Sequence, residues 1–200
     1  MKKIPLVLIL FRLLLGPLMI FIAYNISSHL RAILVLLMFL GLLSDIFDGI
    51  IARKLGISSE KLRRMDSQTD LIFWLCVGWC SWVLNPEIIL QNKLSILLIF
   101  VMEGLTYLFS IMKFGKETCT HALLSKFWGI TLLIAFVSII GFGHAGFPFY
   151  LAILAGIIGH IDVYLIIYFL PKWVHDVPSC YHAYLIRKGV EFKRYKLFNG

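Results

Sequence analysis

The fold of this 200-residue chain is decided by a stretch that reads Asp45-Ile-Phe-Asp48-Gly49-Ile-Ile-Ala52-Arg53 and, after a polar link, Asp66-Ser-Gln-Thr-Asp70. Spacings of three, four and seven residues place Asp45, Asp48, Gly49 and Ala52 on one face of a helix. Asp66 and Asp70 are four residues apart, so they share a face of the next helix. The flanking sequence is overwhelmingly apolar, and carboxylates in such helices are costly unless they are paired or bind cations. The stretch therefore predicts a functional site.

The two halves of this stretch are predicted to meet at matching depth, because the polar link over residues 53–64 makes its flanking helices antiparallel. At about 1.5 Å per residue, Asp48 and Asp66 each lie roughly 8 Å or less into their helices. Asp45 and Asp70 then pair one turn deeper. Oxygen ligands suit Mg²⁺ or Mn²⁺, and two such ions can clamp a phosphoryl-transfer site. The alternative is a structural network of ion pairs with Arg53, Lys54, Arg63 and Arg64.

In this stretch the chain resembles the CDP-alcohol phosphotransferase family, whose signature is D-x2-D-G-x2-A-R-x8-G-x3-D-x3-D. The matching positions are Asp45, Asp48, Gly49, Ala52, Arg53, Asp66 and Asp70. The one departure is Leu62, where the family has glycine. The spacing of Pro5, Arg12 and Pro17 looks like bacterial phosphatidylglycerophosphate synthases of the same family, although Leu6 and Ile9 stand where those enzymes carry Asn and Thr.

The resemblance implies a transferase that uses a CDP-linked donor and an alcohol acceptor, releases CMP and forms a homodimer. It implies two divalent ions, Mg²⁺ or Mn²⁺, held by Asp45, Asp48, Asp66 and Asp70. It also implies that Asp70 is the general base for the acceptor hydroxyl. Gly49 and Ala52 lack bulk and would let the nucleotide approach, whereas Arg53 and Lys126 are placed to meet phosphate. CDP-diacylglycerol is the favoured donor, and glycerol 3-phosphate is a candidate acceptor.

The composition indicates an all-α polytopic membrane protein. Hydrophobic residues make up 60% of the chain, the mean hydropathy is +0.89, and several apolar runs are long enough to span a bilayer. We expect six transmembrane helices, at about residues 4–24, 32–54, 63–84, 93–112, 125–140 and 147–170. Residues 1–171 would form the catalytic domain and residues 172–200 a basic cytoplasmic tail in contact with lipid headgroups.

The distribution of charge predicts the orientation of these helices. Nearly all Lys and Arg residues fall in the N-terminus, the 53–64 link, the 113–121 link and the tail, whereas the other side has only Arg31 and Lys93. The positive-inside rule makes the first side cytoplasmic. The site is thus expected to face the cytoplasm, and the resemblance to bacterial enzymes of the family implies the bacterial inner membrane. A net charge of +8 then indicates contact with membrane lipids, and we expect no nucleic-acid partner.

Other polar residues inside apolar segments are weaker candidates. Arg12 either faces a pocket or snorkels to the membrane surface. Glu103 either faces a polar interior or forms a hydrogen bond between packed helices. Lys113 and Lys116 either receive phosphate or reflect the cytoplasmic charge bias alone, and Asp162 is a candidate for lining the cavity.

Other functions remain open on the sequence alone. The chain could instead transfer a phospho-headgroup from a CDP-alcohol to a lipid acceptor. From different classes of protein, it could be a divalent-cation transporter, since carboxylates in helices also mark ion pathways, or a catalytically silent scaffold.

Overall fold

The computed structural model describes residues 3–25, 31–57, 59–118, 120 and 122–190, and these residues form helices and no strand. The elements in chain order are α1 (Ile4–Asn25), α2 (Arg31–Lys54), α3 (Glu60–Leu84), α4 (Pro86–Gln91), α5 (Lys93–Phe114), α6 (Leu123–Phe136), the π-helical turn η2 (Val137–Gly141), α7 (Gly146–Phe169) and α8 (Cys180–Lys188).

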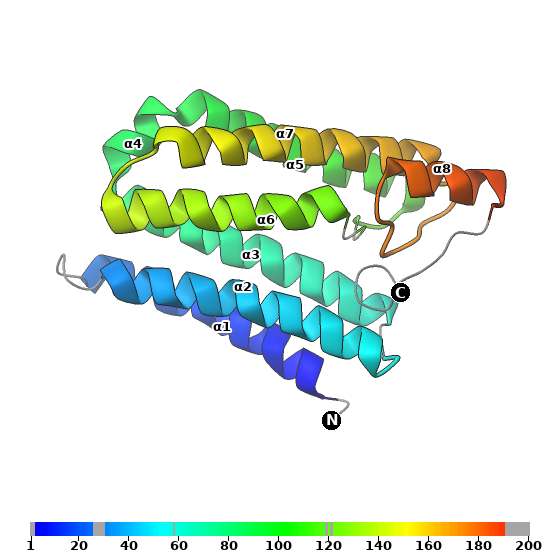
Figure 1. The fold of residues 1–200 in the computed structure, drawn as a ribbon, viewed down its shortest axis with the longest axis horizontal. Helices are drawn as coiled ribbons and strands as arrows, with labels where there is room; N and C mark the ends of the chain where they lie inside the picture. Colours follow the sequence, from blue (N-terminus) through cyan, green and yellow to red (C-terminus); the bar gives the residue numbers. More distant parts are fainter. Residues whose placement is uncertain (1–2, 26–30, 58, 119, 121, 191–200) are drawn as a thin grey trace.

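The long helices form two groups that lie one above the other in Figure 1. In the α1–α3 group, α1 packs along both α2 and α3, and in the α5–α7 group, α7 packs along both α5 and α6. The two groups meet mainly where η2 and α6 contact α2 and α3. Because α2 and α3 are antiparallel, both halves of the acidic stretch lie at the same end of the molecule, here called the motif end.

The link between α2 and α3 is a tight turn that sets this arrangement. Gly56 has φ +62°, a left-handed conformation that glycine adopts without a steric penalty. The Ser59 side chain then caps α3 by accepting a hydrogen bond from the Leu62 amide at 3.2 Å, as expected of serine at a helix start.

At the opposite end of the molecule, here called the far end, η2 connects the two helix groups. A π-helical turn leaves carbonyl groups without their usual helical donors. Asn85 Nδ2 donates to the Ile139 carbonyl at 2.9 Å, and Arg31 Nη1 donates to the Ile140 carbonyl at 3.3 Å. The ends of α2 and α3 are thereby attached to the end of α6.

The core of the α1–α3 group depends on small residues that let the helices approach closely. The buried Phe73 ring of α3 lies against Gly41 of α2, where an added Cβ would come within 2.2 Å of Phe73 Cζ. Gly16 of α1 lies similarly against Cys76, with 2.9 Å between an added Cβ and Sγ. These contacts fix the position of α3 against its two neighbours.

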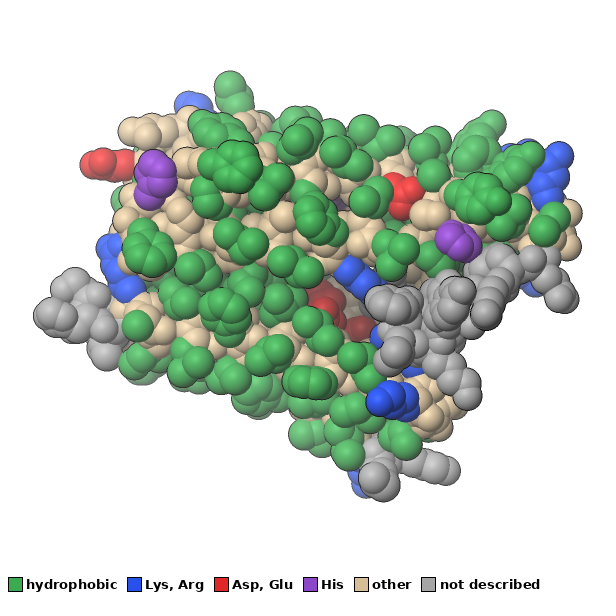
Figure 2. Space-filling model, in the orientation of Figure 1, with side chains coloured by type: hydrophobic (Ala, Val, Ile, Leu, Met, Phe, Trp, Pro, Cys, Tyr) green, Lys and Arg blue, Asp and Glu red, His purple; other side chains and the backbone are tan. Residues whose placement is uncertain are grey.

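The helices define an integral membrane protein. Five segments are long and apolar enough to cross a bilayer: α1, α2, α5, α6 with η2, and α7. Apolar side chains cover much of the face shown in Figure 2. Helix α3 has 25 residues but is not among the five, and its first turns carry charged residues such as Arg63 and Asp66. The six expected long helices are therefore present, while six crossings and cytoplasmic termini stay predictions.

Two short helices were not predicted from the sequence. Helix α4 begins at Pro86, directly after α3, where proline is well suited to the first turn of a helix. Helix α8 lies in the segment expected to be a basic tail, and it ends with Arg187 and Lys188 before Gly189. The rest of the tail's basic cluster (Lys193, Arg194 and Lys196) and most of the expected turn at residues 25–31 lie outside the described residues.

Candidate active site

Arg12 of α1 lies at the centre of the four aspartates and is 1% exposed. Its Nη2 donates hydrogen bonds to Asp48 at 3.1 Å and to Asp66 at 2.5 Å. Its Nη1 lies 2.8 Å from Asp45 Oδ1 and 3.0 Å from Asp70 Oδ1. The pairing by depth expected from the sequence is the one found, since each pair shares one guanidinium nitrogen. Arg12 faces the site and does not snorkel to the membrane surface.

The two pairs of aspartates differ in exposure. Asp48 and Asp66 are each 2% exposed, whereas the side chains of Asp45 and Asp70 are 33% and 28% exposed. Asp70 lines a large cavity between the helix groups. On the face shown in Figure 2, acidic side chains lie beside a basic one in a hollow between the two groups. A ligand can therefore reach Asp45 and Asp70, whereas Asp48 and Asp66 are almost inaccessible.

Arg63 connects this acidic centre to the loop after α7. Its Nη1 lies 3.6 Å from Asp66 Oδ2, and its Nε lies 3.2 Å from Asp176 Oδ2. Asp176 is buried with φ +55°, a conformation that aspartate adopts more readily than most residues. His175 Nδ1 contacts the same Asp176 oxygen at 2.8 Å. The sequence did not indicate Asp176 as a partner of Arg63, whereas Arg63 lies three residues before Asp66 and so shares its helix face.

The residues predicted to bind the nucleotide are gathered beside the acidic centre. A Cβ added to Gly49 would lie 3.3 Å from Arg53 Nη1 and 3.6 Å from Arg63 Nη1, so both guanidinium groups lie against this glycine. Ala52 is buried one turn further along α2. Lys126 of α6 is within electrostatic reach of both arginines. Three cationic side chains thus face the edge of the acidic centre, as an anion site requires.

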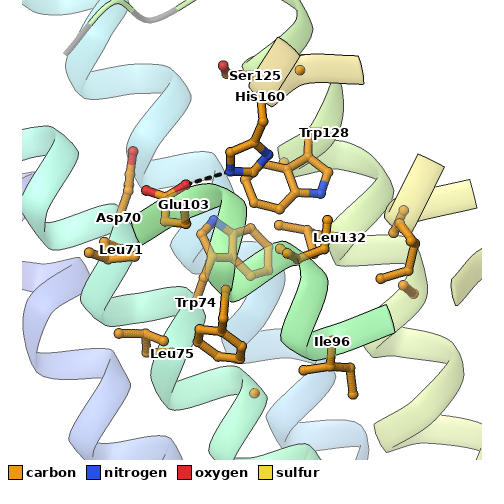
Figure 3. A pocket seen from close by; sticks show the side chains of 18 of the residues that line it. Asp70, Leu71, Trp74, Leu75, Ile96, Glu103, Ser125, Trp128, Leu132 and His160 are labelled. Carbon is orange, nitrogen blue, oxygen red and sulfur yellow. Dashed lines mark hydrogen bonds and ion pairs between the residues drawn. The ribbon is translucent and has the colours of Figure 1, made fainter. Parts of the chain in front are cut away.

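A cavity of about 1350 Å³ runs between α3 and the α5–α7 group (Figure 3). Small-molecule sites typically have volumes of roughly 300–1,000 Å³, so this cavity is larger than a nucleotide needs. Much of its wall is apolar and includes Trp74, Leu75, Trp79, Leu97, Phe100 and Leu132. Asp70, Glu103 and His160 add polar groups to the same wall.

Glu103 and His160 join α5 to α7 inside this cavity. Their side chains meet at 2.8 Å between Glu103 Oε2 and His160 Nε2, the contact drawn in Figure 3. The predicted hydrogen bond between packed helices is therefore found, whereas the cavity that Glu103 also faces is mainly apolar and not the polar interior of the other alternative. The sequence did not indicate His160 as the partner of Glu103.

Other predicted candidates lie away from the acidic centre or are engaged elsewhere. Lys113 Nζ donates to the carbonyls of Ile167 and Tyr168 at the end of α7, at 2.7 and 2.8 Å. Lys116 pairs with Glu60 at 2.8 Å. Asp162 is not among the residues that line the cavity; its Oδ1 accepts the Cys180 amide at the start of α8, at 2.9 Å. Lys126, which lies near Arg53 and Arg63, is the strongest phosphate-binding candidate of the three lysines.

The acidic centre fits a divalent metal site. Carboxylate oxygens of Asp45, Asp48 and Asp66 all lie within 4.8 Å of one another. Four carboxylates carry four negative charges, whereas the contacting side chains of Arg12 and Arg63 supply two positive ones. A surplus of negative charge with oxygen ligands, held among apolar helices, is the chemistry that hard cations match.

The fold and the site together define a membrane-embedded protein with an acidic, metal-compatible centre beside an apolar cavity. The family model for CDP-alcohol phosphatidyltransferase matches residues 2–168, so the chain belongs to that family. Members are transferases of substituted phosphate groups in phospholipid synthesis. Comparison with curated proteins and with solved structures gives no match.

Proposed function

We propose that this chain transfers the phosphatidyl group of CDP-diacylglycerol to a polar alcohol, with release of CMP, in phospholipid biosynthesis. The observation that supports the proposal most is the apolar cavity that reaches Asp70. Burial in such a cavity favours acyl chains over any purely polar substrate. Glycerol 3-phosphate is the first candidate for the alcohol, from the likeness around Arg12 to bacterial phosphatidylglycerophosphate synthases.

The partial exposure of Asp45 and Asp70 suits the geometry of this reaction. A bond forms between the alcohol oxygen and the donor's β-phosphorus while the phosphorus–oxygen bond to CMP breaks, and the two oxygens lie roughly in line. The Asp70 carboxylate takes the hydroxyl proton as general base. Diacylglycerol and the alcohol would then occupy the cavity beside Asp70, whereas CMP would lie towards Gly49, Ala52 and Arg53.

The residues around the phosphates have distinct proposed roles. Asp45, Asp48, Asp66 and Asp70 would hold two divalent ions, Mg²⁺ or Mn²⁺, which neutralise charge on the diphosphate when bound. Arg53 and Lys126 would contact phosphate oxygens, Arg53 as a planar cation that is always charged and Lys126 as a compact ammonium group. Gly49 and Ala52 would leave room for the nucleotide against α2.

The proposed setting is the bacterial inner membrane, with the motif end on the cytoplasmic side where CTP-derived donors are made. Residues 1–171 would form the catalytic domain and residues 172–200 its basic cytoplasmic tail. The concentration of Lys and Arg at the motif end supports this orientation. Resemblance to the family further supports a homodimer.

The test is CMP release by the purified protein in detergent, with labelled CDP-diacylglycerol and a panel of alcohols. We expect release that requires Mg²⁺ or Mn²⁺, is abolished by EDTA and is lost in Asp48→Asn, because a hard-cation site loses a carboxylate ligand. Glu87→Gln, which removes an exposed carboxylate in α4, should behave as wild type. Full turnover in EDTA would contradict the two-metal proposal.

The same cavity would also accommodate the chains of a lipid alcohol next to Asp70, which favours headgroup transfer as the second candidate. Release of CMP from a CDP-linked headgroup with a lipid acceptor, and none from CDP-diacylglycerol, would establish that reaction instead. A cation transporter or a silent scaffold would release no CMP from either donor.

A further inference from the structure

The Glu103–His160 pair has a protonation pattern that its contacts define. His160 Nδ1 lies 2.6 Å from the Gly156 carbonyl oxygen, which can only accept, so Nδ1 carries a hydrogen. The contact between Nε2 and Glu103 Oε2 then needs one more proton, on either the imidazole or the carboxyl group. In both forms the pair as a whole is neutral. A neutral pair is far cheaper to hold in an apolar cavity than an isolated carboxylate.

The pair is rigidly held, and Glu103 retains an oxygen for a ligand. His160 is 4% exposed, and its ring packs edge-on against Trp128 with 5.0 Å between centroids. The Glu103 side chain is 29% exposed, and among the described residues its Oε1 accepts no hydrogen bond. Glu103 lines the cavity, and in Figure 3 its second carboxylate oxygen points away from His160, so Oε1 is an acceptor offered to whatever occupies the cavity.

The pair lies at the depth of the acidic centre. Asp70 is ten residues from the start of α3 at Glu60, and Glu103 is eleven residues from the end of α5 at Phe114. At about 1.5 Å per residue both lie roughly 15–17 Å from the motif end. Asp70 and Glu103 line the same cavity from different helices, as the close view in Figure 3 shows.

We propose that Glu103, held by His160, forms a subsite that accepts a hydrogen bond from a hydroxyl group of the acceptor alcohol other than the one that reacts. The proposal rests on the transferase function proposed above. The subsite would select alcohols with at least two hydroxyl groups, because an alcohol that lacks the second leaves Glu103 Oε1 without a hydrogen-bond donor. Glu103 is a binding residue in this scheme, and His160 is its positioning residue.

The test couples a change in the protein with a change in the alcohol. Wild-type protein is assayed with CDP-diacylglycerol and either glycerol 3-phosphate or 3-hydroxypropyl phosphate, which lacks the middle hydroxyl group. We expect the KM of the second alcohol to be roughly 10-fold higher or more, as loss of a hydrogen bond to a charged or polar partner predicts. In Glu103→Leu the two KM values should be nearly equal, and the KM of the donor should change little.

Two variants separate this role from helix packing. Glu103→Gln keeps a carbonyl acceptor and should recover part of the preference. Tyr164→Phe removes a hydrogen bond between the same two helices, from the Tyr164 hydroxyl to the Met102 carbonyl at 2.6 Å, and Tyr164 does not line the cavity. It should leave the preference intact. The proposal is wrong if Glu103→Leu keeps the wild-type ratio, or if Tyr164→Phe abolishes it.

A binding measurement with glycerol 3-phosphate tests the subsite even if the protein shows no turnover. If wild-type protein releases no CMP from any CDP-linked donor, the transferase proposal fails, and thermal stabilisation by glycerol 3-phosphate is measured instead. Stabilisation of wild type and not of Glu103→Leu supports the subsite. Equal stabilisation of the two, or of neither, overturns it.

Discussion

Arg63 and Asp176 join the acidic centre to a loop more than one hundred residues away in sequence, with 3.2 Å between Arg63 Nε and Asp176 Oδ2. Both side chains are buried. Arg63 also lies 3.6 Å from Asp66. Asp176 therefore holds the arginine that contacts the acidic centre, although Asp176 itself contacts none of the four aspartates in the described part of the chain.

Asp176→Asn should lower CMP release by roughly 10- to 100-fold, the range seen when an outer partner of a metal site is removed. Asparagine also tolerates a positive φ, so the loop conformation should persist, but the buried Arg63 loses an ionic partner and the melting temperature should fall. Activity is therefore compared well below the melting temperature of the variant. His175→Asn removes the more exposed partner of the same carboxylate and is the control, with activity close to wild type. An unaffected Asp176→Asn variant would show that Arg63 needs no such support.

Arg12→Gln should destabilise the protein strongly, since removing one partner of a buried ion pair costs about 3–5 kcal/mol. Four carboxylates then lose their central cation, so Mg²⁺ should raise the melting temperature of the variant more than that of wild type. Arg31→Gln changes an arginine at the far end, where Arg31 bonds the Ile140 carbonyl, and should show no such gain. The measurement is thermal unfolding with and without Mg²⁺, and equal shifts in all three proteins would contradict the expectation.

Gly41→Ala should destabilise the α1–α3 group, because the new Cβ would lie 2.2 Å from the buried Phe73 ring. Overpacking of this kind costs typically 1–3 kcal/mol. Gly78→Ala in α3 is the matched control, since an added Cβ there meets nothing within 4 Å, and it should be neutral or stabilising by up to about 1 kcal/mol. Chemical denaturation of the two variants compares them, and similar stability would show that α2 and α3 can move apart freely.

Leu62→Gly restores the residue typical of the family one turn before Asp66. We expect it to change the KM of the CDP-linked donor more than the Mg²⁺ concentration that gives half-maximal activity. The reason is that Leu62 is half-buried, and its apolar side chain has no atom that could bind a metal ion. Leu62→Ala separates loss of the side chain from gain of backbone freedom. A glycine variant active on donors that wild type ignores would mark Leu62 as the cause of lost catalysis.

Glu117→Gln should lower stability only above a certain pH. The bidentate hydrogen bond from Arg64, at 2.7 and 2.9 Å, lowers the pKa of Glu117 below its usual value. A carboxyl group whose pKa is lower in the folded than in the unfolded state stabilises the folded protein. This stabilisation is complete above the unfolded pKa of about 4.3 and is lost as the pH falls through the folded pKa. The difference in melting temperature between wild type and variant should therefore be constant from neutral pH to about pH 5 and shrink at lower pH. A difference independent of pH would rule out the charged pair.

The four aspartates and their pairing by depth were predictable from the sequence because helical spacing and the short link determine both. The same regularity gave the extents of the long helices, whose ends coincide with runs of polar residues. Arg12 was suggested by its presence in an apolar run, but its contacts with all four carboxylates depend on how α1 packs against two other helices.

Asp176 and the Glu103–His160 pair were not predictable in the same way. Asp176 reaches Arg63 through a left-handed backbone conformation in an irregular loop, and no spacing in the sequence encodes that. Glu103 and His160 are 57 residues apart, so their meeting depends on the register between α5 and α7. Helix α8 was missed because it is short and mixes polar with apolar residues, and because its start is stabilised by the distant Asp162.

The two ends of the molecule hold the helix groups together with different chemistry. At the far end, Asn85 and Arg31 bond to backbone carbonyls of η2. At the motif end the links are ion pairs between charged side chains: Arg63–Asp176, Arg64–Glu117 and Glu60–Lys116. Dissolved salt screens exposed charges over about 8 Å at physiological ionic strength, so it weakens the Glu60–Lys116 and Arg64–Glu117 pairs more than the buried Arg63–Asp176 pair or the bonds at the far end. Raised ionic strength should therefore loosen the contact between the helix groups at the motif end first, while the bonds to η2 still hold the far end together.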